Sequence, residues 1–295
     1  MTSPNVSVLS GITNRVSDIS DSQYDPTWVA AYFDDFGDQE WDRLVKHPAR
    51  EIQLVVHKDV LFRHQSGLDT YLEIGAGPGR FTHALVELEK TVTVTDISPV
   101  QLELNRQKAK EYGFDRGVSE WKQLDICEMS CFDDGSFDAV VAYGGPLSYV
   151  LDKRDVAIQE CIRVVRPGGL IFLGVMSLWG TVHQYLEGVM GYTPEDNAKI
   201  LTTGDLTKAN ASFASHYCHM FRAKELREFL ESHGLEVIDM SASNTLSGVY
   251  GEQLTAIRDD PNKWKMLVEM EIEACREPGY LDGGTHLIAV ARKPV

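Results

Sequence analysis

The stretch Tyr71–Arg80 reads YLEIGAGPGR, and it decides the fold class. An apolar run ends at Ile74 and is followed by glycines at 75, 77 and 79. A strand that runs into a glycine-rich turn and then a helix brings backbone N–H groups to the carboxyl edge of a parallel sheet, where α/β proteins bind ligands. The G-x-G-x-G spacing differs from the G-x-G-x-x-G of dinucleotide folds, and Pro78 removes an N–H that a phosphate would use. Glu73, just before the turn, instead suits a ligand that carries an ammonium group.

The chain beyond this turn alternates between short apolar runs and helical stretches, which is typical of βα units and a mostly parallel sheet. The helices carry end signals: Ser98-Pro99-Val100-Gln101 has the pattern of a capping box with proline at the first helical position, and AKELREFLESH closes at Gly234. We expect strands at residues 70–74, 91–95, 121–125, 138–143, 170–175, 235–240 and 286–292.

Three further segments surround this core. Asp25-Pro26 is a helix start, the segment DQEWDRLVKH reads as a second helix that runs to Pro48, and a third helix follows with Ile52 and Val56 on one face. We predict a flexible segment at 1–22 and one domain at 23–295, which comprises a helical cap at 23–67, a lid insertion at 176–220 and a second insertion at 242–284.

Composition excludes several classes of protein. A hydrophobic content of 43% suffices for a large core, and no apolar run approaches the roughly 18 residues of a membrane span. The five cysteines are odd in number and form no C-x-x-C pair, so we expect reduced thiols and a cytoplasmic protein without a membrane partner. The net charge of −16 repels nucleic acid and favours a neutral or cationic small molecule.

The segment E-I-G-A-G-P-G resembles the first motif of the class I S-adenosylmethionine (SAM)-dependent methyltransferases. The resemblance continues in order: TVTVTDIS ends a second strand on Asp96, WKQLDIC ends a third on Asp125, and DDGSFDAVVAYGGPLSYV and IRVVRPGGLIFLGV are similar to the fourth-strand and fifth-strand segments. It covers residues 68–175 strongly, and 221–240 and 286–292 in outline. It implies an α/β fold with a Rossmann-like, doubly wound, seven-stranded sheet whose last strand is antiparallel.

The resemblance also implies that the cofactor is SAM and assigns residues to it. In the family, the position of Asp96 holds the ribose hydroxyls, that of Asp125 reaches the adenine amino group, and that of Tyr143 lies beside the methyl group. Arg43, on a helix before the core, is a candidate for the methionine carboxylate. The expected cofactor-binding residues are Glu73, Gly75, Ala76, Gly77, Gly79, Asp96, Ile97, Asp125, Ile126, Tyr143 and Arg43.

The cap and the lid are rich in aromatic residues, which favours a cover over a small organic acceptor. Three histidines of the lid, His183, His216 and His219, are candidates for a general base. The segment SHYCHMF also suggests a metal site, but three near-adjacent residues rarely supply tetrahedral geometry, and we predict no metal. The aromatic residues are Tyr24, Trp28, Tyr32, Phe33 and Trp41 in the cap, and Trp179, Tyr185, Tyr192, Phe213 and Tyr217 in the lid.

We therefore predict a methyltransferase that moves a methyl group from SAM to an O, N or S atom of a small-molecule acceptor. The sequence Y-G-G-P-L at 143–147 departs from the N/D-P-P-Y signature of the relatives that act on nucleobases and amides, which disfavours those substrates. A protein methyltransferase and a non-catalytic SAM-binding module remain alternatives, whereas the glycine spacing disfavours an NAD-dependent oxidoreductase. The oligomeric state stays open.

Overall fold

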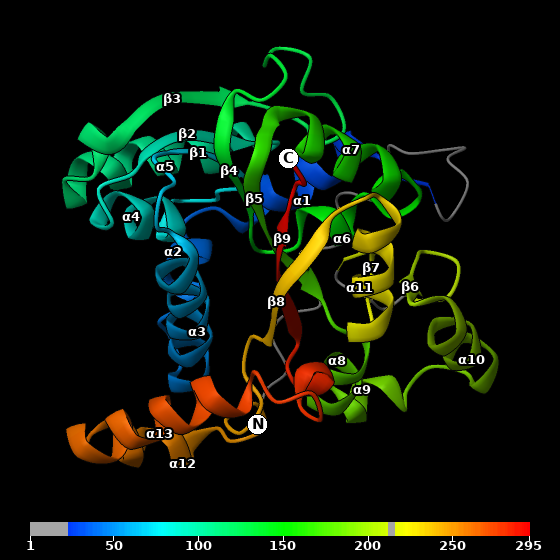
Figure 1. The fold of residues 1–295 in the computed structure, drawn as a ribbon. Helices are drawn as coiled ribbons and strands as arrows, with labels where there is room; N and C mark the ends of the chain where they lie inside the picture. Colours follow the sequence, from blue (N-terminus) through cyan, green and yellow to red (C-terminus); the bar gives the residue numbers. More distant parts are fainter. Residues whose placement is uncertain (1–22, 212–215) are drawn as a thin grey trace.

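A computed structural model describes residues 23–211 and 216–295. Its core is a seven-stranded sheet in the order β3-β2-β1-β4-β5-β9-β8. The five strands from β3 to β5 run parallel, and β9 is antiparallel to both β5 and β8. Helices cover both faces of this sheet (Figure 1). The predicted doubly wound fold with an antiparallel last strand is confirmed.

Most strands lie where the apolar runs predict them, but β5 begins at Val165, before the predicted start at 170, and the third strand is shifted. It begins and ends earlier than predicted, so Asp125 follows the strand. β3 is a half-exposed edge strand, and such a strand shows a weak apolar pattern. The strands are β1 (Thr70–Ile74), β2 (Thr91–Asp96), β3 (Val118–Gln123), β4 (Phe137–Ala142), β5 (Val165–Met176), β8 (Glu236–Ala242) and β9 (His286–Arg292).

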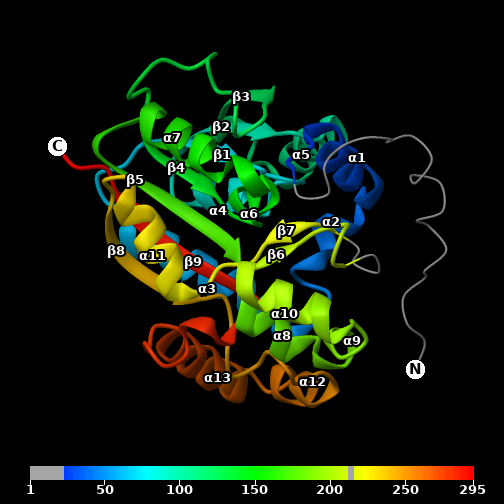
Figure 2. The ribbon, with the colours of Figure 1, turned by 90° about the vertical axis from the view of Figure 1, so that its right-hand side faces the viewer.

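Helices in the described ranges divide between the two faces of the sheet and the region beyond its carboxyl edge (Figures 1 and 2). One face packs against α6, α7 and α11, and the other against α3, α4, α5 and α13. The helices are α1 (Pro26–Phe36), α2 (Gln39–Arg43), α3 (Pro48–His64), α4 (Arg80–Glu87), α5 (Pro99–Tyr112), α6 (Pro146–Tyr149), α7 (Arg154–Val164), α8 (Leu178–Gln184), α9 (Leu186–Val189), α10 (Pro194–Thr203), α11 (Ala223–Ser232), α12 (Glu252–Arg258) and α13 (Pro261–Ala274).

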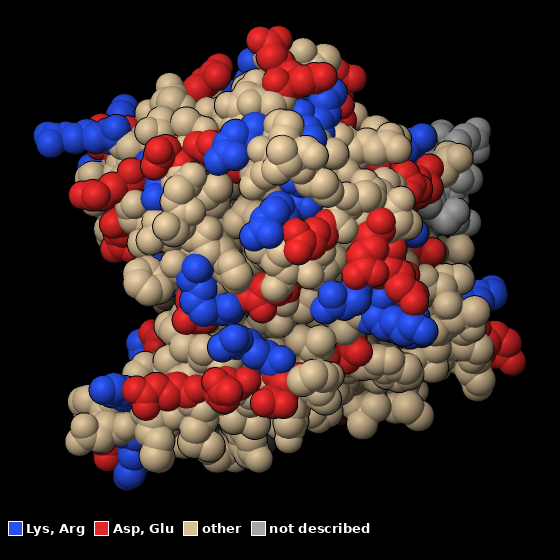
Figure 3. Space-filling view, viewed as in Figure 1, with Lys and Arg blue, Asp and Glu red and all other residues tan. Residues whose placement is uncertain are grey.

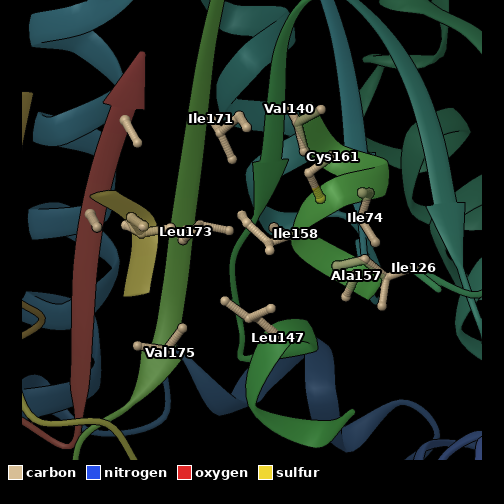
Figure 4. Close-up of a cluster of buried hydrophobic side chains, with 14 of the residues drawn as sticks. Ile74, Ile126, Val140, Leu147, Ala157, Ile158, Cys161, Ile171, Leu173 and Val175 are labelled. Carbon is tan, nitrogen blue, oxygen red and sulfur yellow. The ribbon is translucent and has the colours of Figure 1, made fainter. Parts of the chain in front are cut away.

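The core beneath the site is aliphatic and fully enclosed. Ile158 and Cys161 on α7 face Val140 and Ile171 on the central strands, and all four side chains are inaccessible to solvent (Figure 4). Burying an aliphatic side chain of this size contributes roughly 1.5–3 kcal/mol. The packing holds the carboxyl ends of β1, β4 and β5 in fixed positions, and these ends carry the site.

The N-terminal helices follow the sequence signals in part. The carboxylate of Asp25 caps α1 by accepting from the backbone of Thr27 and Trp28, as predicted. The second helix is shorter than predicted, because residues 44–47 form a turn before Pro48. The capping box before α5 is only half formed: Ser98 accepts from the backbone of Gln101, but the Gln101 side chain bonds to carbonyls at the end of α1.

Two segments extend beyond the sheet. After β5, the chain forms α8, α9 and α10 and a small antiparallel pair, β6 (Asp205–Leu206) with β7 (Cys218–His219), which lie together in Figure 2. After β8, α12 and α13 follow, and α13 packs on α3. Segment 1–22 and Phe213 lie outside the described residues. No helix in the described part of the chain is long and apolar enough to cross a lipid bilayer.

Candidate active site

The glycine turn after β1 requires glycine for two physical reasons. Gly75 and Gly79 both have positive φ angles, of 65° and 101°. A Cβ on Gly75 would also lie 2.7 Å from Pro146 Cγ, and one on Gly79 would lie 2.8 Å from Asn105 Nδ2. Any side chain would therefore strain the backbone and collide with its neighbours. The turn brings the backbone of Gly77 to the surface of a cavity.

This cavity has a volume of about 790 Å³ and lies at the carboxyl edge of the sheet. This volume lies in the upper half of the range for small-molecule sites, which is roughly 300–1,000 Å³. The sheet edge contributes Gly75, Gly77, Asp96, Ile97, Leu124, Ile126, Tyr143 and Gly144 to its wall. The cap contributes Tyr24, Tyr32, Phe33, Phe36, Glu40, Arg43 and Arg50, and the lid contributes Met176, Thr181, Val182, Tyr185, Tyr192 and His216.

Asp96 lies at the end of β2 and faces this cavity. Its carboxylate accepts hydrogen bonds from the backbone N–H groups of Gly77 and Ser98, each at 2.8 Å. Burial raises the pKa of Asp96 to about 6, against the lowering effect of these two hydrogen bonds. The carboxylate is thus held rigidly against the glycine turn, where it can accept hydroxyl groups of a ligand.

Glu73 lies under the turn and does not line the cavity. It is 2% exposed and accepts a hydrogen bond of 2.6 Å from the hydroxyl of Thr82. Burial raises the pKa of Glu73 to about 8, so its carboxyl group is mostly protonated at neutral pH. The side chain therefore lies beneath the turn, and its predicted contact with an ammonium group stays a prediction. Ala76 and Gly79 are likewise absent from the cavity wall.

The loop after β3 places Ile126 in the cavity wall and Asp125 behind it. Asp125 accepts a hydrogen bond of 2.8 Å from the backbone of Cys127. Tyr24, which does line the cavity, has its pKa raised by burial and by the neighbouring Asp125. Asp125 itself does not line the cavity, and its predicted contact with a ligand stays a prediction.

Arg43 lines the cavity and is paired within it. Its guanidinium contacts the carboxylate of Glu40, with Nη2 at 2.6 Å from Oε1 and Nε at 2.7 Å from Oε2. A ligand carboxylate at Arg43 would therefore share it with Glu40, which the sequence analysis did not select. Tyr143 also lines the cavity, and its buried hydroxyl has no hydrogen-bond partner in the described part of the chain.

The three predicted histidines lie in different environments. His216 lines the cavity, and burial lowers its pKa to about 4, so the ring is neutral at pH 7. His219 is buried outside the cavity, with its Nδ1 at 2.7 Å from Asp205 and its Nε2 at 2.9 Å from Glu225. Both ring nitrogens are therefore used within the fold. His183 is exposed and does not line the cavity. The structure thus retains one of the three as a candidate base.

His286 and Arg50 are among the polar wall residues that were not predicted from the sequence. His286 is the first residue of β9 and pairs with Met176 at the end of β5, which brings it to the carboxyl edge. Arg50 lies in the first turn of α3. The periodicity that identified strand 286–292 gave the position of His286, but nothing local in the sequence indicates that this strand end meets the cap.

Comparisons with known proteins agree on the family. A family model described as a methyltransferase domain matches residues 72–173. The ubiquinone biosynthesis O-methyltransferase of Colwellia psychrerythraea is 29% identical over 171 residues, which are 58% of this chain and 62% of that protein. The protein of the same name from Methylocella silvestris is 27% identical over 218 residues, 65% of this chain and 82% of the relative. The match to the Colwellia relative thus spans less than two thirds of its length.

Solved structures share the fold. A putative methyltransferase in complex with the Haloferax volcanii Trm112 activator has a TM-score of 0.57 at 19% identity, covering 90% of this chain and 98% of its own. The [4+2]-cyclase SpnF has a TM-score of 0.56 at 20% identity, and the match covers 95% of this chain and 100% of the cyclase. Because a cyclase and a methyltransferase share this architecture, the fold alone does not decide the reaction. The matched methyltransferase domain and the curated relatives, together with the motif order and the sheet topology, indicate a class I SAM-dependent methyltransferase.

Proposed function

We propose that this protein transfers a methyl group from SAM to a hydroxyl group of a small, largely apolar acceptor. The observation that carries the proposal is that one cavity is lined on one side by the glycine turn and Asp96, and on the other by the aromatic cap, the lid and His216. SAM supplies a methyl group on a sulfonium, which is already a good leaving group. The protein must then hold the acceptor oxygen in line, and such positioning contributes roughly 7–11 kcal/mol.

The residues of the sheet edge fit the cofactor. Asp96 offers a fixed carboxylate to the ribose hydroxyls, and Ile97 and Ile126 offer apolar contacts to the base. Arg43 is our candidate for the methionine carboxylate, and Glu40, also in the wall, replaces Glu73 as the candidate for the ammonium group.

The choice of a hydroxyl acceptor rests on chemistry and on the relatives. The matched curated relatives are named O-methyltransferases of ubiquinone biosynthesis, and aromatic side chains dominate the cap side of this cavity. A hydroxyl must lose its proton as the O–CH3 bond forms. We propose that the neutral ring of His216 accepts a hydrogen bond from this hydroxyl and receives the proton during transfer.

We further propose that the partner is a metabolite and that the protein acts in the cytoplasm. The free cysteines support a reducing compartment. On the face shown in Figure 3, basic and acidic side chains are interleaved. That face therefore offers no continuous basic track of the kind that binds nucleic acid.

Calorimetry with S-adenosylhomocysteine (SAH) tests the cofactor half of the proposal. We expect wild-type protein to bind, and Asp96→Asn to weaken binding roughly tenfold or more, because the charged acceptor for two hydroxyls is lost. Asp134→Asn, at an 82% exposed side chain, is the matched control and should bind as the wild type does. No binding of SAH by folded wild-type protein would end the proposal.

Incubation with methyl-labelled SAM tests the transfer itself. Pools of catechols and other phenols, amines and thiols would be offered separately. We expect label in a phenolic product. Label in protein would support a protein methyltransferase, and tight SAH binding without transfer to any pool would support a non-catalytic SAM-binding module.

A further inference from the structure

Arg50 brings a positive charge into the cavity wall without a carboxylate beside it. Its Nη1 donates to Gln53 Oε1 at 2.9 Å and its Nη2 donates to the Tyr185 hydroxyl at 3.2 Å. Within residues 23–211 and 216–295, no ion pair involves this guanidinium, whereas Arg43 on the same wall is paired with Glu40. In a chain with a net charge of −16, an uncompensated arginine in a mostly apolar cavity requires an explanation.

A buried network fixes this arginine and a neighbouring histidine. Gln53 is 2% exposed, and its Nε2 donates to Asn244 Oδ1 at 2.9 Å and to Thr285 Oγ1 at 3.1 Å. Thr285 Oγ1 in turn lies 3.1 Å from Nδ1 of His286. When the hydroxyl of Thr285 donates to Nδ1, the proton of the neutral imidazole lies on Nε2. His286 then has an N–H donor to offer a ligand.

A third donor lies on the lid side of the same region. The hydroxyl oxygen of Thr181, on α8, is buried in the cavity wall and has no hydrogen-bond partner among the described residues. A buried hydroxyl without a partner is destabilising, because it has lost its hydrogen bonds to water. A ligand oxygen that accepts from Thr181 would remove this cost.

These donors lie far from Asp96 along the carboxyl edge of the sheet. In the sheet order, β9, which begins at His286, lies four strands away from β2, which ends at Asp96. At roughly 4.8 Å per strand, the two ends are about 19 Å apart. This distance separates the region from the ribose position at Asp96, whereas Arg43 is close enough to His286 for its charge to add to the effect of burial in lowering the pKa of that histidine.

We propose that the acceptor is an apolar acid, and that Arg50, His286 and Thr181 bind its carboxylate while Met176 and Val182 contact its apolar body. Gln53 is the positioning residue that holds Arg50 and, through Thr285, His286. This assignment rests on the proposed function, since it names the class of acceptor for that site. It also replaces the expectation of a neutral or cationic acceptor that the net charge gave.

A pair of fluorescent probes tests the assignment by binding, without turnover. 8-Anilinonaphthalene-1-sulfonate (ANS) has an apolar body and an anionic group, and N-phenyl-1-naphthylamine has the same body without the charge. We expect wild-type protein to bind ANS more tightly, and Arg50→Met to weaken ANS roughly tenfold or more while leaving the neutral probe unaffected. 3-Phenylpropionate should displace ANS, and 3-phenylpropionamide should not.

Arg258→Met, on α12, is the matched control. Arg258 pairs with Glu51, which follows Arg50 on α3, and it does not line the cavity. It should bind both probes as the wild type does. Equal loss of both probes in Arg50→Met, no loss of ANS, or a wild type that prefers the neutral probe would overturn the assignment. A parallel SAH titration separates the two proposals: failure to bind SAH defeats the proposed function, whereas the probe preference reports on the arginine alone.

Discussion

Replacing Glu73 by Gln should stabilise the protein at neutral and alkaline pH. The carboxyl group is buried beneath the glycine turn, and burial, opposed by hydrogen bonds from Thr82 and reinforced by the charge of Asp96, raises its pKa to about 8. In the unfolded chain the same group has a pKa near 4.5. Glutamine has nearly the same shape, keeps an oxygen that accepts from Thr82, and has no proton to lose.

The expected magnitude follows from proton linkage. Between pH 4.5 and pH 8 the folded state keeps a proton on Glu73 that the unfolded state releases, so the free energy of unfolding decreases as the pH rises. The slope is about 1.4 kcal/mol per pH unit, so the wild type loses up to about 3 kcal/mol between pH 4.5 and pH 7 through this one group. Glu73→Gln does not have this loss, and its advantage over the wild type should therefore grow with pH until about pH 8.

Urea unfolding followed by tryptophan fluorescence at pH 5, 6, 7 and 8 measures this difference. Subtracting the wild-type curve from that of the variant removes the contribution of other groups, Asp96 included. Glu269→Gln, at a 65% exposed side chain, is the control and should run parallel to the wild type. If Glu73→Gln also ran parallel, the buried carboxyl group would already be ionised in the folded protein, and the reasoning would be refuted.

Three further predictions concern the lid, its histidine and the cofactor. Gly180→Ala should destabilise the protein by about 1–3 kcal/mol in urea, because its Cβ would lie 1.7 Å from the carbonyl oxygen of Gly284, whereas Gly188→Ala, with open space around it, should not. His219→Gln should lose more stability at pH 6 than at pH 9. Burial lowers the His219 pKa, but its two carboxylate partners outweigh burial and raise it, so the histidine stabilises the fold at low pH and less as the pH rises through the raised pKa. Equal losses at both pH values would contradict this prediction. Calorimetric affinity for SAH should fall as the pH drops through about 6, where Asp96 gains a proton, and Asp96→Asn should show no such dependence.

The sheet-edge wall of the cavity was largely predictable because its signals are local. A glycine turn directly after an apolar run fixes both the strand and the helix that follows, and Asp96 is placed by the end of the next strand. Ile126 was placed in the wall by the same reasoning, even though β3 ends earlier than predicted. Motif spacing does not give the direction of a side chain, and for this reason Glu73 was expected in the cavity but lies beneath it.

The acceptor half depends on contacts between segments that are far apart in the sequence. Gln53 bonds to residues 191 and 232 positions away, and these bonds bring the arginine of the cap and the histidine of the last strand to one wall. The three lid histidines looked equivalent in the sequence, yet only His216 reaches the cavity, because the short β6–β7 pair turns His219 toward Asp205 and Glu225. Such placements follow from tertiary packing, which has no local sequence pattern.

The net charge is a weak guide to the acceptor, for a reason that lies in the range of electrostatic forces. At physiological ionic strength, exposed charges are screened beyond about 8 Å, so most of the acidic surplus acts on the solvent around it. A charge in an enclosed cavity is screened much less. A single arginine in the wall, held by a buried amide and free of any acidic partner among the described residues, therefore outweighs many distant carboxylates in selecting what binds there. The charge of a ligand is better inferred from the groups that face it than from the sum over the chain.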